Sequence, residues 1–544
     1  MHSHIVKIAF LSLTLLFVRC AQVVPLSGGN KDEEPPKLLE AIPLNASTNF
    51  TASVVTLKFN EFITLKQISS ELLVSPSLKN NPEIEADGKK VRIKLKKEDL
   101  RPNTTYKIFF GNAIADMHEG NSLKGFEYIF STGPTIDTLK LSGNVISAFE
   151  NEEPGETVVG LYIKSDITND SFVCKKRPDY VTRGDAKGGF KFSYLPNVDY
   201  ALVAFTDKNK NFTYEKDAEK IAFSSDAVHP LKDTNPQIRL FSEIPSKLFI
   251  KRSAIVYAGK LQVIYNKRSK FKVELLKKNE TVFYYEDAQS ERDTLNIFYT
   301  SKADSIQLSI KSLLQDRADT LRLLLPKTKA FKAKSLVLDP NFDNGVLERE
   351  SPLILRSNNL LDEVKLAKNK FSMKYKKDSI EVNEALDMTL IDPLHLEVNN
   401  KLQEGIDYRI IADTAAVFDQ QGRYNDSLKI DVKLRTKAEL GHLSLNMLFN
   451  LKQSYIVQLL GEKGKVELER TVSFSLSSSN KVKLDLEGVK PGTYSVKVIF
   501  DTNENNKWDT GDLMKKKQPE NVFFSNKQIK VMPDWDVEEE IRVN

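Results

Sequence analysis

The chain has 544 residues, and its composition excludes several classes of protein. Hydrophobic residues make up 40% and charged residues 28%, so each domain can bury a core. The net charge of +5 is too small for this length to mark a nucleic-acid-binding protein, and we expect no nucleic-acid partner. Two cysteines exclude a disulfide scaffold, and six histidines leave little for a histidine-based metal or catalytic site.

The N-terminal segment has the features of an export signal. Lys7 is followed by a mostly apolar run over residues 8–18, which is shorter than the roughly 20 residues that a membrane-spanning helix needs. The alternative is a buried N-terminal helix, but no capped or amphipathic pattern follows the run. We therefore expect residues 1–19 to be a signal peptide.

Cys20 follows this run directly and resembles the acylated cysteine of a bacterial lipoprotein. Arg19 departs from that pattern, which has a small residue before the cysteine. Residues 20–37 contain a Gly-Gly pair, a KDEE run and Pro35-Pro36, and they are similar to the tethers of Bacteroidetes lipoproteins. The resemblance implies a lipidated tether that anchors the chain in the outer membrane, with exposure at the cell surface.

Beyond the tether, the dominant pattern is an alternation of apolar and polar residues. In the first clear example, Val55, Leu57 and Phe59 alternate with polar residues, and the same alternation recurs at residues 91–95 and 482–486. Such alternation is typical of half-buried antiparallel strands, and the short spacing with Asn, Asp, Gly and Pro turns indicates sandwiches or barrels. The sequence predicts an all-β fold, a tandem array of about five antiparallel β-sandwich domains.

Two internal repeats set the expected domain organisation. The spacing from Leu100 to Tyr106 recurs from Leu402 to Tyr408, and Asp116 corresponds to Asp419 with one residue of slip. We interpret each tyrosine as a corner residue whose hydroxyl caps backbone. A second repeat has equal spacing from Tyr200 to Asp207 and from Tyr494 to Asp501.

These segments resemble known families. Residues 38–134 resemble the bacterial Ig-like domain of S-layer proteins through L-x-P-N-T-x-Y and a closing F-S-T-G, and residues 337–438 look like a degenerate copy. Residues 135–243 and 439–544 resemble prealbumin-like, carboxypeptidase-regulatory β-sandwiches. Residues 244–336 match no family pattern and are expected to be a further β-sandwich. The whole chain resembles the Ig-like-domain lipoproteins of Bacteroidetes.

The sharpest local motif is DTNENNKWDTGD in the last predicted domain. Its oxygen donors have the spacing of a calcium-wrapping loop: Asp501, Asn503, Asn505, the backbone carbonyl of Lys507, Asp509 and Asp512. Asn506 and Asp512 depart from an EF-hand, which has Gly and Glu there. The alternative is an Asx-rich hairpin turn, with Trp508 as a partly buried anchor. Calcium is the only cofactor that the sequence predicts. An earlier loop from Asp207 is a weaker candidate, because Ala218 occupies its twelfth position.

A third signal is an Asp-[Ser/Thr]-apolar triplet, which resembles the O-glycan acceptor of exported Bacteroidetes proteins. Strand starts also favour Asp, a β-branched residue and an apolar residue in succession. The triplets can therefore mark either glycan acceptors or the starts of strands. The candidate acceptors are Thr138, Thr294, Ser305, Thr320, Ser379, Thr414 and Ser427.

No motif for catalysis is found, whether G-x-S-x-G, Walker A, H-E-x-x-H or a Rossmann glycine pattern, and we predict no catalytic residues. We expect a non-catalytic cell-envelope lipoprotein with a structural or adhesive role, binding an unknown protein or glycan partner. The alternative is an accessory or nutrient-capture lipoprotein beside an outer-membrane transporter or surface enzyme. Clustered exposed aromatic residues would favour glycan capture.

Overall fold

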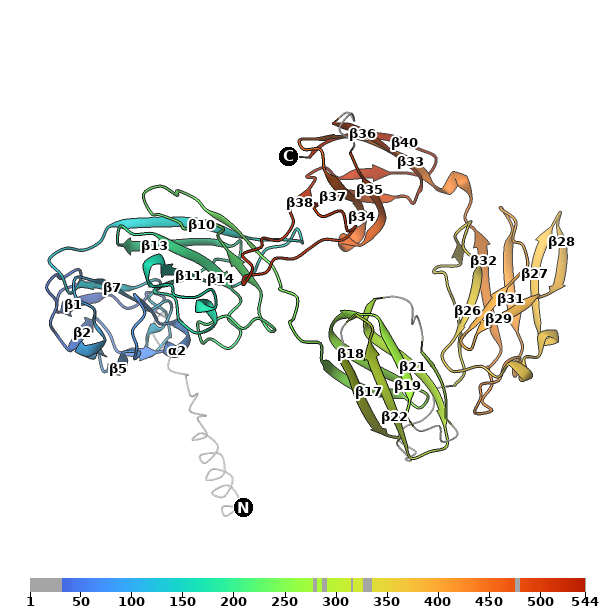
Figure 1. Cartoon of the computed structure of the whole chain (residues 1–544), viewed down its shortest axis with the longest axis horizontal. Coiled ribbons are helices and arrows are strands. Elements are labelled where there is room, and N and C mark those ends of the chain that lie inside the picture. Colours follow the sequence, from blue (N-terminus) through green and yellow to red (C-terminus); the bar gives the residue numbers. More distant parts are fainter. Residues whose placement is uncertain are drawn as a thin grey trace, which may run out of the picture. The chain divides into compact units, whose positions relative to one another are not determined.

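The computed structural model describes residues 32–276, 281–285, 291–314, 317–325, 335–474 and 480–543. The predicted signal peptide, Cys20 and most of the tether lie outside the described residues. The chain is built almost entirely of antiparallel β-strands (Figure 1), which confirms the all-β multi-domain prediction. Helical segments are single turns, such as α2 (Ile68–Glu71) and η5 (Glu363–Lys365).

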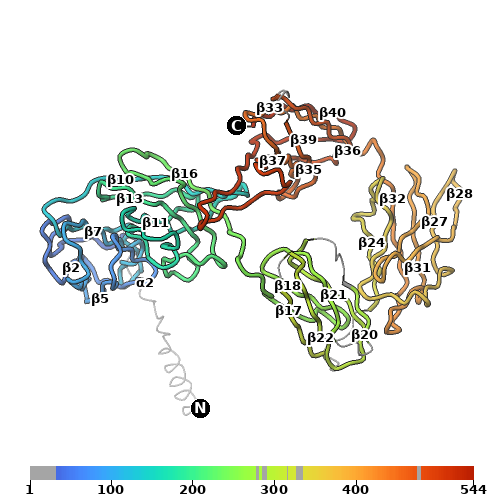
Figure 2. The backbone as a smooth tube through the Cα atoms, viewed as in Figure 1, coloured from blue at the N-terminus to red at the C-terminus, as the bar shows by residue number. Residues whose placement is uncertain are grey.

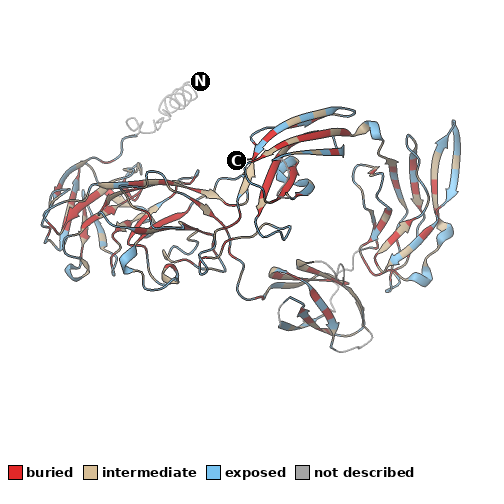
Figure 3. Ribbon diagram, turned by 45° about the horizontal axis from the view of Figure 1, so that its top comes forward, coloured by how far each residue is buried: buried red, intermediate tan, exposed pale blue. Residues whose placement is uncertain are grey.

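The alternation in the sequence forms the strands that it predicts. In β2 (Val54–Phe59), the side chains of Val55, Leu57 and Phe59 are fully buried, and the residues between them face outward. β6 (Lys90–Lys94) repeats the pattern. Figure 3 shows buried and exposed positions alternating along many strands. Burial of one face of each strand supplies the apolar contacts that hold two sheets together.

The chain forms two compact units. The first contains residues up to 145, 155–213 and 226–238, and the second contains residues 146–154, 214–225 and 239–544. Figure 2 traces the backbone through both. Three short segments of the second predicted sandwich therefore belong to the same unit as the C-terminal part of the chain.

The first unit opens with an Ig-like sandwich. One sheet has the order β1-β2-β6-β5, from β1 (Leu38–Ile42) to β5 (Glu83–Asp87). The facing sheet has the order β4-β7-β9, formed by β4 (Leu73–Ser75), β7 (Thr105–Phe109) and β9 (Glu127–Ser131). A short ribbon pairs β3 (Ile63–Leu65) with β8 (Ile114–Asp116).

The second sandwich follows in the same unit. β10 (Leu139–Ser147) pairs with β13 (Gly189–Leu195), and β11 (Val158–Ile163) lies between β12 (Tyr180–Arg183) and β14 (Tyr200–Phe205). It is joined to the first sandwich by buried contacts. The Ser75 hydroxyl accepts the Val181 N–H at 3.1 Å, and the Ser77 N–H donates to the Asp179 carbonyl at 2.8 Å. These contacts fix the two sandwiches of this unit against each other.

The second unit contains the strands after residue 244. Residues 250–324 form two sheets. One has the order β17 (Ile250–Tyr257), β18 (Lys260–Ser269), β21 (Arg292–Ser301) and β20 (Thr281–Tyr285). The other has the order β19 (Phe271–Leu275), β22 (Ser305–Ser312) and β23 (Arg317–Leu324). Residues 338–434 form two further sheets. One has the order β24 (Leu338–Pro340), β26 (Leu353–Ser357), β30 (His395–Val398) and β29 (Met388–Asp392). The other has the order β25 (Val346–Leu347), β32 (Leu428–Leu434), β31 (Asp407–Ala412), β27 (Phe371–Lys377) and β28 (Ile380–Ala385). Each pair of sheets encloses its own apolar core.

The C-terminal module closes the chain. The sheet β36-β33-β40 is formed by β33 (Gly441–Phe449), β36 (Lys481–Val489) and β40 (Asp536–Val543), and β40 runs parallel to β33. The facing sheet, in the order β35-β34-β37-β38, contains β34 (Ser454–Leu460), β35 (Val466–Val472), β37 (Gly492–Asp501) and β38 (Val522–Phe524). The predicted calcium loop begins where β37 ends.

Candidate functional site

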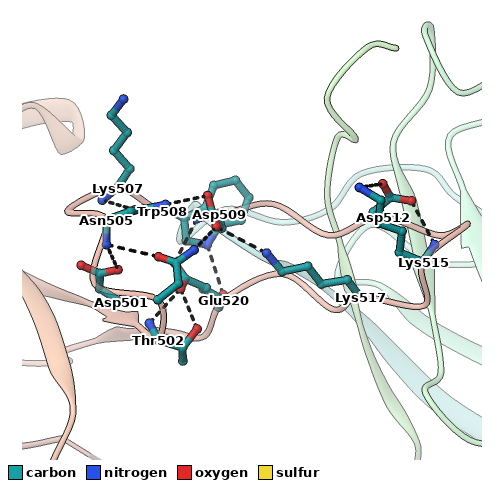
Figure 4. Close-up of polar contacts among 11 residues, drawn as sticks. Asp501, Thr502, Asn505, Lys507, Trp508, Asp509, Asp512, Lys515, Lys517 and Glu520 are labelled. Atoms are coloured by element: carbon teal, nitrogen blue, oxygen red, sulfur yellow. Dashed lines mark hydrogen bonds and ion pairs between the residues drawn. The ribbon is translucent and has the colours of Figure 1, made fainter.

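The loop after β37 is ordered around Asp501, whose carboxylate is fully buried. One oxygen accepts the Asn505 N–H at 3.0 Å (Figure 4). The other accepts the Asn506 N–H at 2.9 Å. Glu504 and Asn506 take φ values of 59° and 57°, so the backbone turns through the left-handed region at both. A short polar side chain that caps two backbone donors is what stabilises such a turn.

Two asparagines and Asp509 converge above Asp501. The Asn503 and Asn505 amide nitrogens both donate to the Asp509 carboxylate, and the Lys517 ammonium lies 3.4 Å from it. The Asn503 amide oxygen accepts the Asn505 N–H, and the Asn505 amide oxygen accepts the Lys507 N–H. A half-turn about the Cβ–Cγ bond of either asparagine would place its amide oxygen, instead of its nitrogen, beside the Asp509 carboxylate.

One predicted donor, Asp512, lies apart from the others. The Asp512 carboxylate faces Lys515, accepting its N–H at 3.1 Å and pairing with its ammonium at 3.5 Å, apart from the cluster around Asp509 (Figure 4). The Lys507 side chain extends to Glu291 at 3.3 Å. Within the described part of the chain, no three His, Cys, Asp or Glu side chains gather as a metal-binding group.

Glu520 closes the loop, although no sequence motif marked it. Its buried carboxylate accepts the Thr502 N–H and hydroxyl at 2.8 Å each, and the Asp509 N–H at 3.0 Å. Trp508 donates its indole N–H to the Glu520 carbonyl at 3.1 Å, and its ring lies 4.5 Å from that of Phe149. Trp508 is thus the partly buried anchor that the sequence predicts.

The earlier loop from Asp207 has the same hydrogen-bond pattern. The Asp207 carboxylate accepts the N–H groups of Asn211 at 3.0 Å and Phe212 at 3.2 Å. Farther along, the buried Glu219 carboxylate accepts the Glu215 N–H at 3.0 Å, as Glu520 accepts that of Asp509. The internal repeat is therefore a repeat of a loop structure, including a closing glutamate that sequence spacing alone does not reveal.

The loop at residues 501–520 packs against the three short segments that share its unit. Thr510 donates its hydroxyl to the Ser242 carbonyl at 2.6 Å, and the Leu513 N–H donates to the Glu243 carboxylate at 2.8 Å. Glu243 is buried and also accepts the Tyr214 hydroxyl at 2.8 Å. The loop is consequently a joint within this unit.

Lys497 lies beneath this joint. The side chain is 3% exposed, and its ammonium lies 3.2 Å from the centroid of the Phe149 ring and 5.5 Å from that of Phe524. Burial lowers the pKa of Lys497 to about 8, and the nearby Glu150 charge opposes that shift. Two aromatic faces take the place of water around the cation.

The acidic residues of the Ig-like turns have structural contacts. Asp116 is buried and accepts the N–H groups of Glu119, Gly120 and Asn121 at 2.6–2.9 Å. Burial raises the pKa of the Asp116 carboxyl, but these backbone donors outweigh it and hold the pKa below its usual value. Asp419, its repeat partner, is equally buried and accepts from Gln421 and Arg423. Both aspartates close turns.

The candidate glycan acceptors fall into two groups. Thr138, Ser305, Ser379 and Ser427 each lie at or just before the first residue of a strand, as the strand-start alternative predicts. Thr294 lies inside β21 (Arg292–Ser301) and is half-buried, whereas Thr320 in β23 and Thr414 in a loop are exposed. Strand-start chemistry therefore does not account for Thr294, Thr320 and Thr414, and of these three Thr320 and Thr414 are exposed.

Exposed aromatic side chains do not gather at one sandwich tip among the described residues. The most exposed rings are spread over four of the predicted domains: Phe62, Phe249, Tyr424 and Trp535. The feature that would have favoured glycan capture is therefore not present in the described ranges.

No helix in the described ranges combines the length and apolarity that crossing a membrane requires.

Two family models match parts of the chain. Residues 32–132 are similar to the bacterial Ig-like domain family, and residues 454–537 are similar to a family described as "Uncharacterized protein conserved in bacteria (DUF2141)". The second match contains the whole loop from Asp501 to Glu520. A comparison with curated proteins finds no match.

Solved structures give only distant likenesses. The crystal structure of the S-layer protein rSbsC aligns at 10% identity and a TM-score of 0.14, over 91% of this chain and 67% of that one. The N-terminal four Ig domains of Dscam1 isoform 7.44 align at 9% identity and a TM-score of 0.14, over 94% of this chain and 100% of that one. Native alpha-2-macroglobulin from Escherichia coli (domains MG0-NIE-MG1) aligns at 13% identity and a TM-score of 0.14, over 54% of this chain and 97% of that one. Alignments at these scores carry no argument about this chain.

The fold and the family match together define the class. This is an Ig-like, β-rich protein made of several sandwich domains.

Proposed function

We propose that this protein is a non-catalytic cell-envelope lipoprotein, anchored in the outer membrane through Cys20, whose sandwich modules form a structural or adhesive scaffold. The observation that carries the proposal is the joint at residues 501–520. A loop that serves as a joint directs some of its donors and side chains to other segments of the chain. Here Thr510 and Leu513 bond to residues 242 and 243, and Trp508 packs on Phe149. The loop fixes one part of the chain to another, as a scaffold requires.

Calcium is the cofactor that we propose for this loop. The donor set contains the carboxylates of Asp501 and Asp509, two asparagine amides and the Lys507 carbonyl, and hard oxygen ligands of this kind suit Ca²⁺. The Lys517 ammonium lies 3.4 Å from Asp509, and it would have to move away for Ca²⁺ to bind there, because like charges repel. The hydrogen-bonded Asx network is the alternative state of the same residues.

Fractionation of the native envelope tests the anchor. We expect the wild-type protein in the outer-membrane fraction and the Cys20→Ser variant in the soluble fraction, because a chain that loses its acyl groups has no strong membrane anchor. Retention of the variant in the membrane would contradict lipid anchoring. Arg19→Ala is the companion variant: if Arg19 slows processing, this change raises the acylated fraction.

A chemical cross-link followed by affinity purification from detergent-solubilised envelope tests the scaffold. We expect envelope proteins or surface glycan to be recovered with the wild type. Recovery of one transporter or one surface enzyme in constant ratio would instead support the accessory or nutrient-capture role. A monomer with no cross-linked neighbour would contradict both roles.

A further inference from the structure

The first unit contains a hollow whose lining is strongly basic. It has a volume of about 860 Å³ and lies where the two sandwiches of that unit meet. Six cations line it, against the single carboxylate of Asp179: Lys79, Lys96, Arg101, Lys175, Lys176 and Arg177. The whole chain has a net charge of only +5, so this gathering is a local feature.

Only part of this charge is neutralised by the protein. Asp179 is 1% exposed, and its carboxylate pairs with Arg101 at 3.2 Å and Lys176 at 3.0 Å. Its second oxygen also accepts the Ile163 N–H at 3.0 Å. Lys79, Lys96 and Lys175 are exposed, and none of them pairs with a carboxylate among the described residues. Like charges held this close repel one another, so an anion in the hollow would be favoured.

An apolar cavity of about 250 Å³ adjoins the hollow, and the two share Ser77, Leu78, Asn81 and Arg177 as lining residues. The cavity walls are mainly aliphatic, with Ile68, Leu72 and Ile84 among them, and Phe212 lies at one side. The Arg177 guanidinium lies 5.8 Å from the Phe212 ring centroid and 3.5 Å from the Asn81 side-chain oxygen. Arg177 therefore stands at the boundary between the apolar and basic parts.

We propose that this paired cavity binds an anionic amphiphile, with a phosphate or carboxylate head in the basic hollow and a short alkyl or acyl segment in the apolar cavity. The volumes fit this division, since an apolar protein cavity of about 150 Å³ is enough to hold benzene. Arginine and lysine are the side chains that recognise phosphate and carboxylate groups. A neutral amphiphile would bury its tail but leave the lysines unpaired.

The rigid joint between the sandwiches makes the site preorganised. Val181 lines the apolar cavity and also donates its N–H to Ser75, while Ser77 lines both cavities and bonds to the carbonyls of residues 178 and 179. A site held by backbone hydrogen bonds loses little conformational entropy on binding. The proposal goes beyond the scaffold role, because it assigns a ligand class to a surface that scaffolding does not use.

Titration calorimetry of the full mature chain carrying Cys20→Ser tests the proposal with defined probes. We expect octyl phosphate, below its micelle concentration, to bind about tenfold or more tightly than inorganic phosphate or octyl glucoside. Binding weakens as NaCl is raised, because the head is held by charge. Equal affinity for octyl phosphate and octyl glucoside would overturn the proposal, as would binding of neither.

Matched charge reversals locate the site. Lys96→Glu with Lys175→Glu should weaken octyl phosphate binding about tenfold or more. Lys58→Glu with Lys140→Glu makes the same change of net charge at exposed positions of the same unit, outside the hollow, and should have little effect. An equal loss in both pairs would show non-specific charge attraction and overturn the site. Phe212→Ser should abolish the preference for octyl over butyl phosphate, and an unchanged preference would overturn the role of the apolar cavity.

Vesicles distinguish the source of the ligand. Phosphatidylcholine vesicles with about 30 mol% phosphatidylglycerol present the same phosphate chemistry as a lipid headgroup. Sedimentation of the Cys20→Ser chain, but not of the same chain carrying Lys96→Glu and Lys175→Glu, with these vesicles supports a membrane lipid as the ligand. Calorimetric binding of octyl phosphate without vesicle binding supports a free amphiphile.

Discussion

Tyr106 and Tyr408 make the same hydrogen bond in two separate sandwiches. The Tyr106 hydroxyl accepts the Arg101 N–H at 2.7 Å, and the Tyr408 hydroxyl accepts the Gln403 N–H at 2.9 Å. Both rings are buried, at 1% and 3% exposure. In each case the turn has a backbone N–H that would otherwise be unpaired. The tyrosine at the start of the next strand accepts that N–H. The two tyrosines therefore close equivalent turns in the two repeats.

Removing either hydroxyl should destabilise its own module. Tyr106→Phe and Tyr408→Phe each leave a partly buried N–H without an acceptor, which costs about 1–3 kcal/mol. For a module of roughly 100 residues, each kilocalorie lowers the melting temperature by about 4–8 °C. Calorimetry should show the loss in one transition only. Tyr375→Phe removes a side-chain contact at the sheet surface and is the control; a loss of equal size there would contradict the turn-closing role.

Lys497 should make the stability of the second unit rise with pH. The pKa is about 8 in the folded chain and about 10.5 in the unfolded chain. Between these values the unfolded state binds more protons, so the free energy of unfolding increases as pH rises from about 8 to about 10.5. The shift corresponds to about 3 kcal/mol at most, and the Phe149 face reduces it by favouring the charged form.

Comparison of wild type with Lys497→Met isolates this effect from other titrations. The stability difference between the two should change across pH 8–10 in the direction that favours wild type, because methionine has no proton to lose. Lys530→Met, at an exposed position on β39 (Ile529–Val531), should show a constant difference. A constant difference for Lys497→Met as well would mean that this lysine stays protonated throughout.

Much of the fold could be predicted because strands carry a local signal. Alternation at residues 55–59 and 91–95 directly encodes which side chains face the core, and the repeated tyrosines and aspartates mark equivalent turns. Glu520 and Glu219 could not be predicted as loop residues. Only folding brings Glu520 to the Asp509 N–H and Glu219 to the Glu215 N–H. The basic hollow was equally hidden, since its cations come from three stretches that are far apart in sequence.

Glycosylation should distinguish the triplets by exposure. We predict hexose on peptides that contain Thr320 and Thr414, because both are exposed and neither is at a strand start. The half-buried Thr294 inside β21 should stay bare, since a sugar there would disrupt pairing with β18 (Lys260–Ser269). Mass spectrometry of protein from the native organism measures this. Unmodified masses at all seven sites would contradict glycosylation of these triplets.

Calcium should stabilise the second unit through the loop that begins at Asp501. Four carboxylates lie along residues 501–512, those of Asp501, Glu504, Asp509 and Asp512, and a divalent ion would relieve their repulsion where Lys517 only partly does. Extracellular sites need affinities of only about 10⁻⁴–10⁻³ M. At ten times the dissociation constant, the free energy of unfolding rises by about 1.4 kcal/mol. The full chain is required for this measurement, because the loop packs against residues 242 and 243.

Asp509→Asn is the informative variant, because it removes a ligand charge but leaves the backbone caps of Asp501 intact. It should abolish the calcium-dependent rise in melting temperature. Glu504→Gln removes one charge from the same loop at an exposed position outside the donor set, and it should keep the rise. Calorimetry with about 10 mM calcium, and with magnesium at the same concentration, separates ligation from screening. Identical melting temperatures with and without calcium in the wild type would leave Asp501, Asn503 and Asn505 as a hydrogen-bonded Asx turn that needs no ion.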